Sequence, residues 1–515
     1  MSILRDWNRF WFKRTSCVPV AMVRILMGIL VIAAAIQLWP DRFVWFSEHG
    51  LLPFKIAVQY NDNYTAGPRP INFLQYATQD WQISAFFVVY MLIAFCMTIG
   101  FCTRTSILLV WIGLNCIHNR DSLNNTTGGD EIMLITTAYM FFAKAGGAIS
   151  VDRLIRVWRG IENPNGTRDA APPNLDAFSR LWRWVEDFNR GPVMSIWPQR
   201  LMQLQVSVVY LSTFLNKTLG QQWQNGTAVY YPYQTIEFHR FAVPFMDRNF
   251  HPHFWIPAMN ENNPGIIALM TYGTLAIELS LGLLVWVPRL RLYVLAAGIF
   301  LHMGIEYAMN IPLFAFLMIA TYPCFLTKDD LNNFSAVLIR KLNLSRLRVV
   351  FDGDCEFCRS AALLLRSMDS LKLLRFLDYH DPDELRQVPS VAFEDADDAV
   401  IVVPQPWPSR RRGRLEVDTR AEWPESTVDA RQFAGFYGFR QIARRVPSLW
   451  GLVPLMYIPG VNLVGERVYA SIAAKRRTLP VAPAIVRERS RRSYGAKETA
   501  GSRRAARRSK TESRK

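Results

Sequence analysis

The stretch VVFDGDCEFC, Val349 to Cys358, carries the densest set of reactive side chains in this chain of 515 residues. The apolar and β-branched run LRVVF predicts a short buried strand that ends before Asp352. Gly353 supplies a turn, and CRSAALLLRSMDSL follows with apolar residues at helical spacing. Cys355 is therefore expected at, or just before, the start of a helix.

Further strands and helices are predicted after this stretch. LLRFLDY and AVIVV are typical of a second and a third strand, and FAGFYGFRQIARRV of a helix. A strand, helix, strand, strand and helix in this order predict a small α/β domain.

The two aspartates allow a phosphotransferase interpretation. A strand followed by Asp-Gly-Asp resembles the start of haloacid dehalogenase-type phosphatases, in which the first Asp (Asp352 here) attacks and the second (Asp354) acts as acid and base. Asp397 and Asp398 would supply the acidic pair that binds metal in such enzymes, but here they precede a strand instead of following one.

A zinc half-site is the second interpretation, and it requires further ligands. After Cys358 the chain contains no cysteine, and its only histidine there is His380. A metal site within one chain is therefore not expected.

A dithiol is the third interpretation, because Cys-x-x-Cys at a helix start is the thioredoxin-like arrangement. Amides at the helix start favour the thiolate of Cys355, which makes it the attacking sulfur. Cys358, about one turn later, resolves the mixed disulfide. The acids Asp352, Asp354 and Glu356 disfavour a nearby anion, so a modestly reducing or weakly activated couple is expected. Such exchange requires no cofactor.

VVFDGDCEFC also resembles the signature of the DCC family of thiol-disulfide oxidoreductases, over about Leu347 to Arg476. The resemblance implies a thioredoxin-like fold and a protein thiol or disulfide as substrate. It also implies that Cys355 and Cys358 are the redox pair, with Asp352 and Asp354 as signature residues.

The chain up to about Phe325 alternates long apolar runs with short polar links. Because a helix needs about 20 apolar residues to span a bilayer, about eight crossings are predicted. Four runs are long, and four are shorter or more polar. They are Val18–Leu38, Ile83–Gly100, Ile266–Val287 and Leu290–Ala308, then Ile107–Ile117, Ile132–Phe142, Val206–Leu219 and Pro312–Leu326.

Basic residues in the links predict the orientation of these crossings. The segment Met1–Cys17 and the link Lys144–Arg200 are rich in Lys and Arg, whereas Gly220–Pro264 is poor in them. We expect an integral, multi-pass protein of a bacterial inner (cell) membrane, with the lipid bilayer as partner and the soluble half in the cytoplasm. The basic tail at 481–515 is expected to be disordered, and nucleic acid is not expected as a partner.

Ionisable residues at membrane depth are functional candidates, and we single out Lys217 and His302. A desolvated lysine can act as a base, and a buried histidine can relay protons.

The region from about Val18 to Leu326 resembles the HTTM domain shared with vitamin K-dependent gamma-carboxylases. The matching stretches include VPVAMVRILMGILVI, QLQVSVVYLSTFLNKTLGQQWQNGTAVYY and FLHMGIEYAMNIPLFAFLMIATYPCFL. The resemblance implies that Lys217 is the base in quinone chemistry, and that a quinone is a possible cofactor.

Together these interpretations divide the chain into four parts. We expect an HTTM-like transmembrane domain at 1–326, an amphipathic linker at 327–346, a DCC-type domain at 347–480 and the tail at 481–515. The predicted function is membrane-bound thiol-disulfide exchange. The alternatives are a receptor or transporter-like protein with a redox-sensing domain, and a carboxylase-like quinol epoxidase.

Overall fold

The chain is seen in a computed structural model that falls into two compact units. One comprises residues 1–150 and 192–327, and the other residues 151–191 and 328–515. The structure describes residues 2–51, 53, 56, 72–77, 79–120, 128–159, 193–234, 263–309, 311, 313–405, 410–411, 414–415, 431–476, 478–483 and 485. Most of the predicted basic tail, from residue 486 onward, lies outside these residues.

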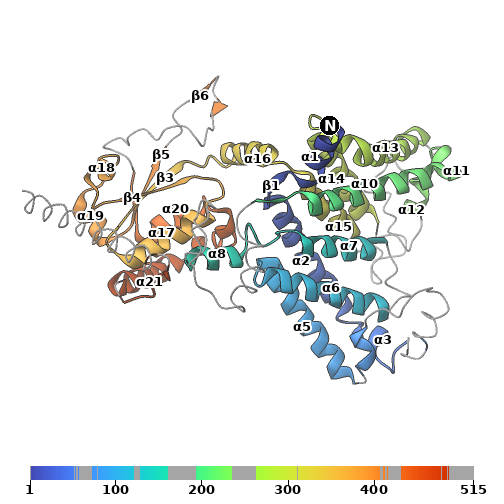
Figure 1. Ribbon diagram of the computed structural model, residues 1–515, viewed down its shortest axis with the longest axis horizontal. Helices are drawn as coiled ribbons and strands as arrows, with labels where there is room; N and C mark the ends of the chain where they lie inside the picture. The colour runs from blue at the N-terminus through green and yellow to red at the C-terminus, as the bar shows by residue number, and fades with distance from the viewer. Residues whose placement is uncertain are drawn as a thin grey trace, which may run out of the picture. The chain divides into compact units, whose positions relative to one another are not determined.

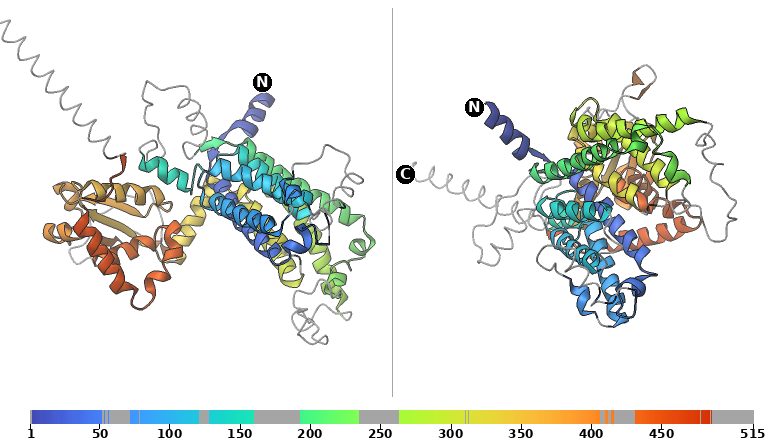
Figure 2. Two further views of the ribbon diagram at one scale, coloured as in Figure 1. Left: turned by 90° about the horizontal axis from the view of Figure 1, so that it is seen from below. Right: turned by 90° about the vertical axis from the view of Figure 1, so that its right-hand side faces the viewer.

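The first unit is built from helices, which the left view of Figure 2 shows running side by side. All eight apolar runs are helical over most of their described length. The longer helices are α2 (Val18–Leu38), α5 (Asp80–Ile99), α6 (Thr103–Arg120), α7 (Gly128–Phe142), α10 (Trp197–Thr218), α13 (Pro264–Leu283) and α14 (Arg291–Ala308). The shorter ones are α1 (Ser2–Phe12), α3 (Arg42–Phe46), η1 (Phe73–Tyr76), α11 (Gln221–Gln224), α12 (Tyr230–Gln234), η4 (Leu284–Trp286), α15 (Phe314–Thr321) and η5 (Tyr322–Phe325). Two short strands, β1 (Arg14–Ser16) and β2 (Val193–Ser195), pair antiparallel.

Within the described residues, three helices are long and apolar enough to cross a membrane. They are Val18–Leu38, Asp80–Ile99 and Pro264–Trp286, and Phe314–Phe325 is a shorter apolar helix. The remaining predicted crossings are shorter, as α7 is, or carry polar residues in their interior, as α6 and α14 do. Length and composition therefore support three candidate spans, fewer than the eight predicted.

The buried Arg24 of α2 has a structural role in the first unit. Its guanidinium donates hydrogen bonds to the backbone carbonyls of Ala145 (2.6 Å) and Ile149. These contacts pair the terminal nitrogens of a guanidinium that is fully buried.

The second unit contains a four-stranded sheet in the order β4-β3-β5-β8. Figure 1 labels three of its strands, β3, β4 and β5. The central strand β3 (Arg346–Phe351) pairs parallel with β4 (Leu374–Asp378) and antiparallel with β5 (Ile401–Gln405). β5 pairs antiparallel with β8 (Phe433–Ala434). The predicted α/β domain with three strands is present, and the two-residue strand β8 is an addition that no sequence pattern indicated. A short separate hairpin consists of β6 (Arg410–Arg411) and β7 (Arg414–Leu415).

Apolar residues cover both faces of this sheet. On one face, Leu347 and Val349 pack with Ala362 of α17 (Glu356–Met368) and Ile442 of α20 (Gly435–Ala443). On the other face, Val350 packs with residues around α18 (Pro382–Leu385) and α19 (Phe393–Asp398). Side chains of a strand alternate between faces, so β3 contributes to both cores and is held from both sides.

Helix α8 (Val151–Trp158) belongs to the second unit, although the chain places it between segments of the first. It packs against α17, and Arg153 donates a hydrogen bond to the carbonyl of Ser367 (3.2 Å). Helices α16 (Lys328–Lys341) and α21 (Val461–Lys475) are also part of this unit.

Asp369 closes the connection from α17 to β4. Its carboxylate accepts hydrogen bonds from the amides of Leu373 (3.0 Å) and Leu374 (2.8 Å). Burial raises the pKa of Asp369 from 3.8 to about 6, because desolvation outweighs these hydrogen bonds.

This raised pKa predicts a pH-dependent stability. The folded state holds the proton of Asp369 more tightly than the unfolded state does. The stability gained from this proton is complete below the unfolded pKa of 3.8 and is lost as pH rises through about 6. Relative to Asp369→Asn, the wild-type free energy of unfolding should fall by about 3 kcal/mol over this window. Pulse proteolysis in urea measures this free energy of unfolding for the second unit. The exposed Asp383→Asn serves as control, and parallel pH profiles for wild type and Asp369→Asn would contradict the prediction.

Candidate active site

The two cysteines lie at the start of α17, directly after the central strand. Cys355 is the N-cap of α17, and its Sγ accepts a hydrogen bond from the amide of Cys358 (3.2 Å). Cys355 is 7% exposed, Cys358 is half-buried, and both are free thiols. An amide that points at Sγ is the contact that stabilises a thiolate at a helix N-terminus.

The environments of the two sulfurs differ. Burial raises the pKa of the Cys358 thiol, and the hydrogen bond and charge of Cys355 and the charge of Asp352 raise it further, while Arg476 lowers it. A negative charge on Cys355 therefore disfavours ionisation of Cys358.

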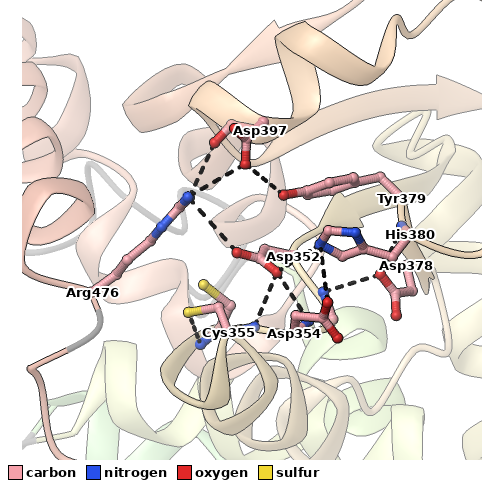
Figure 3. A network of polar contacts seen from close by, with 10 residues as sticks. Asp352, Asp354, Cys355, Asp378, Tyr379, His380, Asp397 and Arg476 are labelled. Atoms are coloured by element: carbon pink, nitrogen blue, oxygen red, sulfur yellow. Dashed lines mark hydrogen bonds and ion pairs between the residues drawn. The ribbon is translucent and has the colours of Figure 1, made fainter.

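Asp352 fixes the loop that carries the dithiol, as Figure 3 shows. It is 8% exposed, and its Oδ1 accepts hydrogen bonds from the amides of Asp354 (2.9 Å) and Cys355 (3.0 Å). His380 Nε2 lies 3.2 Å from the same oxygen. Asp352 thus orients the first turn of α17, and this oxygen is already engaged by the protein's own donors.

Gly353 is required by a close approach to a second aspartate. Its amide donates to Asp378 Oδ1 (3.0 Å), which also accepts from the amide of His380 (3.0 Å). A Cβ at position 353 would lie 1.7 Å from Asp378 Oδ2, so no larger residue fits without moving the loop.

Arg476, at the end of α21, brings a positive charge to the site. One of its guanidinium nitrogens lies 3.7 Å from Asp352 Oδ2 and 3.6 Å from Asp397 Oδ1. Asp397 Oδ1 also accepts a hydrogen bond from the hydroxyl of Tyr379 (2.7 Å). Partial burial lowers the pKa of Arg476, but the charges of Asp352, Cys358 and Cys355 outweigh this, and the pKa is raised overall.

His380 and Arg476 were missed by the sequence analysis as site residues. His380 follows β4. The carboxyl ends of the parallel strands β3 and β4 lie at the same edge of the sheet, so the two predicted strands could have indicated that His380 lies near the dithiol. Arg476 reaches the site across more than a hundred residues of chain from Asp352, and no local pattern marks it.

Asp354 and Asp397 are the other acids considered for a phosphotransferase or metal site, and each contacts different partners. The side chain of Asp354 is 85% exposed, and its carboxylate lies 3.8 Å from His380 Nε2. Asp397 contacts Tyr379 and Arg476. In the part of the chain that the structure describes, no group of three or more His, Cys, Asp or Glu side chains is arranged to hold a metal ion.

Lys217 and His302 belong to the first unit, whereas the dithiol belongs to the second. Lys217 of α10 forms an ion pair with the buried Glu278 of α13, and its ammonium lies 4.8 Å from the ring centre of Trp223. His302 Nε2 lies 2.6 Å from the hydroxyl of Tyr210. No sequence pattern indicated Tyr210 as a partner of His302.

The position of Arg476 predicts an electrostatic effect on the dithiol. Arg476→Gln removes the charge that balances Asp352, so alkylation of Cys355 by iodoacetamide at neutral pH should slow by about threefold to tenfold. Arg476→Lys should recover part of the rate.

Arg386→Gln is a matched control, because it removes the same charge from an exposed ion pair with Asp383. Equal alkylation rates for Arg476→Gln and Arg386→Gln would show that Arg476 has no specific influence on the sulfurs.

Comparison with known proteins agrees with this geometry in the second unit. The family model described as DCC1-like thiol-disulfide oxidoreductase matches residues 349–481. No curated protein and no solved structure matches the chain. The matched segment begins within β3 and includes Asp352, both cysteines, His380 and Arg476. Residues 349–481 therefore carry a DCC1-like thiol-disulfide oxidoreductase domain, which supports thiol-disulfide oxidoreductase as the enzyme class of this protein.

Proposed function

We propose that the protein is a membrane-bound thiol-disulfide oxidoreductase in which Cys355 attacks and Cys358 resolves. The observation that carries the proposal is the hydrogen bond from the Cys358 amide to Cys355 Sγ at the N-terminus of α17. It favours a thiolate on Cys355, whereas Cys358 remains protonated.

The arrangement of the sheet supports a thioredoxin-like fold for this domain. The dithiol follows the central strand β3, β4 runs parallel to it, and β5 and β8 complete the sheet in antiparallel order. This places Cys355 at the carboxyl edge of the sheet and at a helix start, as a dithiol of this class requires.

The proposed exchange has two steps. The Cys355 thiolate attacks one sulfur of a protein disulfide, that S–S bond breaks, and the leaving thiolate takes a proton from solvent. Cys358 then gives its proton to solvent and attacks Cys355 Sγ. The S–S bond between Cys355 and the substrate breaks, and the released substrate thiolate takes up a proton from solvent. After the exchange, the domain holds a Cys355–Cys358 disulfide and the substrate holds two thiols.

The order of these steps follows from the charges at the site. The negative charge of Cys355 is among the causes that raise the pKa of Cys358. When Cys355 enters the mixed disulfide, this charge disappears while Arg476 remains, so the pKa of Cys358 falls when its thiolate is needed. Asp352 holds the loop in place, and the exposed Asp354 is available to a docking substrate.

The dithiol proposal predicts different outcomes for the two cysteines. Cys355→Ser should abolish reduction of insulin disulfides by the full chain in detergent, because the attacking sulfur is lost. Cys358→Ser should abolish turnover but accumulate a mixed disulfide on Cys355, which mass spectrometry detects.

Cys324→Ser removes a buried cysteine of the first unit and is the control. Full turnover by Cys355→Ser would rule out the enzymatic proposal and favour a non-catalytic, redox-sensing role for the domain.

We also propose that the first unit spans the membrane and that its buried polar cluster holds a quinone. The three candidate spans support the first part. The cluster consists of Lys217, Glu278, Tyr210, His302 and Tyr322, in which the Tyr210 hydroxyl lies 2.7 Å from the Tyr322 hydroxyl. Such groups are costly in an apolar environment and usually mark a functional site.

The residues fit a ligand that bears two oxygens. Glu278 Oε2 and His302 Nδ1 are buried, and neither has a hydrogen-bond partner among the described residues. Glu278 Oε2 would accept a hydrogen bond from a hydroxyl of the quinol, and His302 Nδ1 would hold the other oxygen of a quinol or an oxygen of a quinone, a ligand that supplies two-electron redox chemistry when bound. The contact with Glu278 occupies the Lys217 amine, so a role as base requires that pair to open.

The quinone proposal predicts a loss of binding in variants of this cluster. Lys217→Ala and His302→Leu should each weaken binding of a short-chain ubiquinone by about tenfold, since each removes a polar contact in an apolar site. Quenching of tryptophan fluorescence measures binding directly, because Trp223 contacts Lys217.

Lys144→Ala is the control, since Lys144 lies in the same unit but outside the cluster, and it donates a hydrogen bond to the carbonyl of Val193 (3.4 Å). Wild-type affinity in both cluster variants would contradict the quinone site and leave the dithiol proposal intact.

A further inference from the structure

Large apolar side chains are exposed along one side of α21 and the turn that precedes it. Their exposed fractions run from 40% to 63%. They form what we call the α21 patch: Leu455, Ile458, Leu463, Val464, Val468 and Ile472. An apolar surface of this extent marks an interaction site in a folded protein.

The opposite side of α21 explains why these side chains point outward. A Cβ at Gly465 would meet the ring of Phe436 at 2.5 Å, so α21 lies directly on α20. Tyr469 accepts a hydrogen bond from the amide of Val400 (2.9 Å), next to β5. Gly460, at φ 88°, allows the turn into the helix. The fold therefore fixes the inner side of α21 and leaves the α21 patch uncovered by described side chains.

Basic and aromatic side chains border the α21 patch. Arg467 and Lys475 are exposed on α21, whose only acidic residue is Glu466. The guanidinium of Arg440 lies 4.5 Å from the ring centre of Tyr457, in η7 (Leu455–Tyr457). Aliphatic residues with Tyr, Lys and Arg at their edge are the composition of surfaces that bind the interface of an anionic bilayer.

The sequence connection between the two units is short. Only Leu326 and Thr327 separate η5 of the first unit from α16 of the second. Ile339 of α16 is fully buried in a cluster against which Trp450 of η6 (Pro447–Leu452) packs, and η6 leads into the turn before α21. A short tether of this kind gives a surface site a high effective concentration at the membrane.

We propose that the α21 patch docks onto the headgroup region of the bilayer that holds the chain's own apolar helices. The inference rests on the proposal that the first unit spans a membrane, and it does not depend on the chemistry of the dithiol. Arg476 ends α21 and contacts Asp352, so docking of α21 would link the bilayer surface to the dithiol site.

Photolabelling of the full chain in lipid nanodiscs tests this surface. The nanodiscs contain phosphatidylglycerol with a photoactivatable headgroup, and labelled peptides are identified by mass spectrometry. In wild type we expect label on the peptides of 455–475. The variant Val464→Glu with Val468→Glu should lose about tenfold of this label, because two charges replace apolar contacts.

Arg386→Glu is the matched control, since it shifts the charge of the exposed helix α18 by the same amount. It should leave the labelling of 455–475 unchanged. Cys355 alkylation at the wild-type rate in the double variant would confirm that the domain remains folded.

The outcomes separate the two proposals. Label on peptides flanking α2 and α5 without label on 455–475 would overturn docking alone. Absence of label from both regions would overturn the membrane proposal as well. Undiminished labelling in the double variant, or cross-links from 455–475 to a second copy of the chain in place of lipid, would also overturn docking to the bilayer.

Discussion

The site depends on one buried carboxylate, that of Asp352. Its Oδ1 accepts hydrogen bonds from the amides of Asp354 and Cys355, and these contacts turn the chain from β3 into α17. The same turn aims the amide of Cys358 at Cys355 Sγ. Gly353 is part of this constraint, because Asp378 occupies the space that its side chain would need. The dithiol therefore takes its geometry from acids that a reader of the sequence would count mainly as negative charge.

These acids would oppose a thiolate if nothing balanced them. Arg476 lies 3.7 Å from Asp352, and His380 lies 3.2 Å from it on the other side. The two sulfurs add to the attraction that raises the pKa of Arg476, so the guanidinium responds to charge on the dithiol as well as on Asp352. The site thus pairs the carboxylate of Asp352, which holds the loop, with the guanidinium of Arg476 from the far end of the domain's sequence.

The first unit poses a separate chemical question. Its helices include three that could cross a membrane, yet they bury the carboxylate of Glu278 and the imidazole of His302. Burial of such groups costs free energy unless their polar atoms are paired or serve a function. Lys217 and Tyr210 contact only one polar atom each of Glu278 and His302 among the described interactions. Two residues, Leu326 and Thr327, separate these helices in sequence from α16 of the unit that carries the dithiol.

The sequence by itself determined the local features, since strand and helix periodicity and the Cys-x-x-Cys spacing depend on neighbouring residues. It predicted β3, α17 and the place of Cys355 at the helix start, and it marked Lys217 and His302. Only the tertiary structure decided which residues complete these sites. Arg476, Glu278 and helix α8 reach their partners from distant parts of the chain. Such contacts follow from how the elements pack in three dimensions, and no local pattern of residues encodes them.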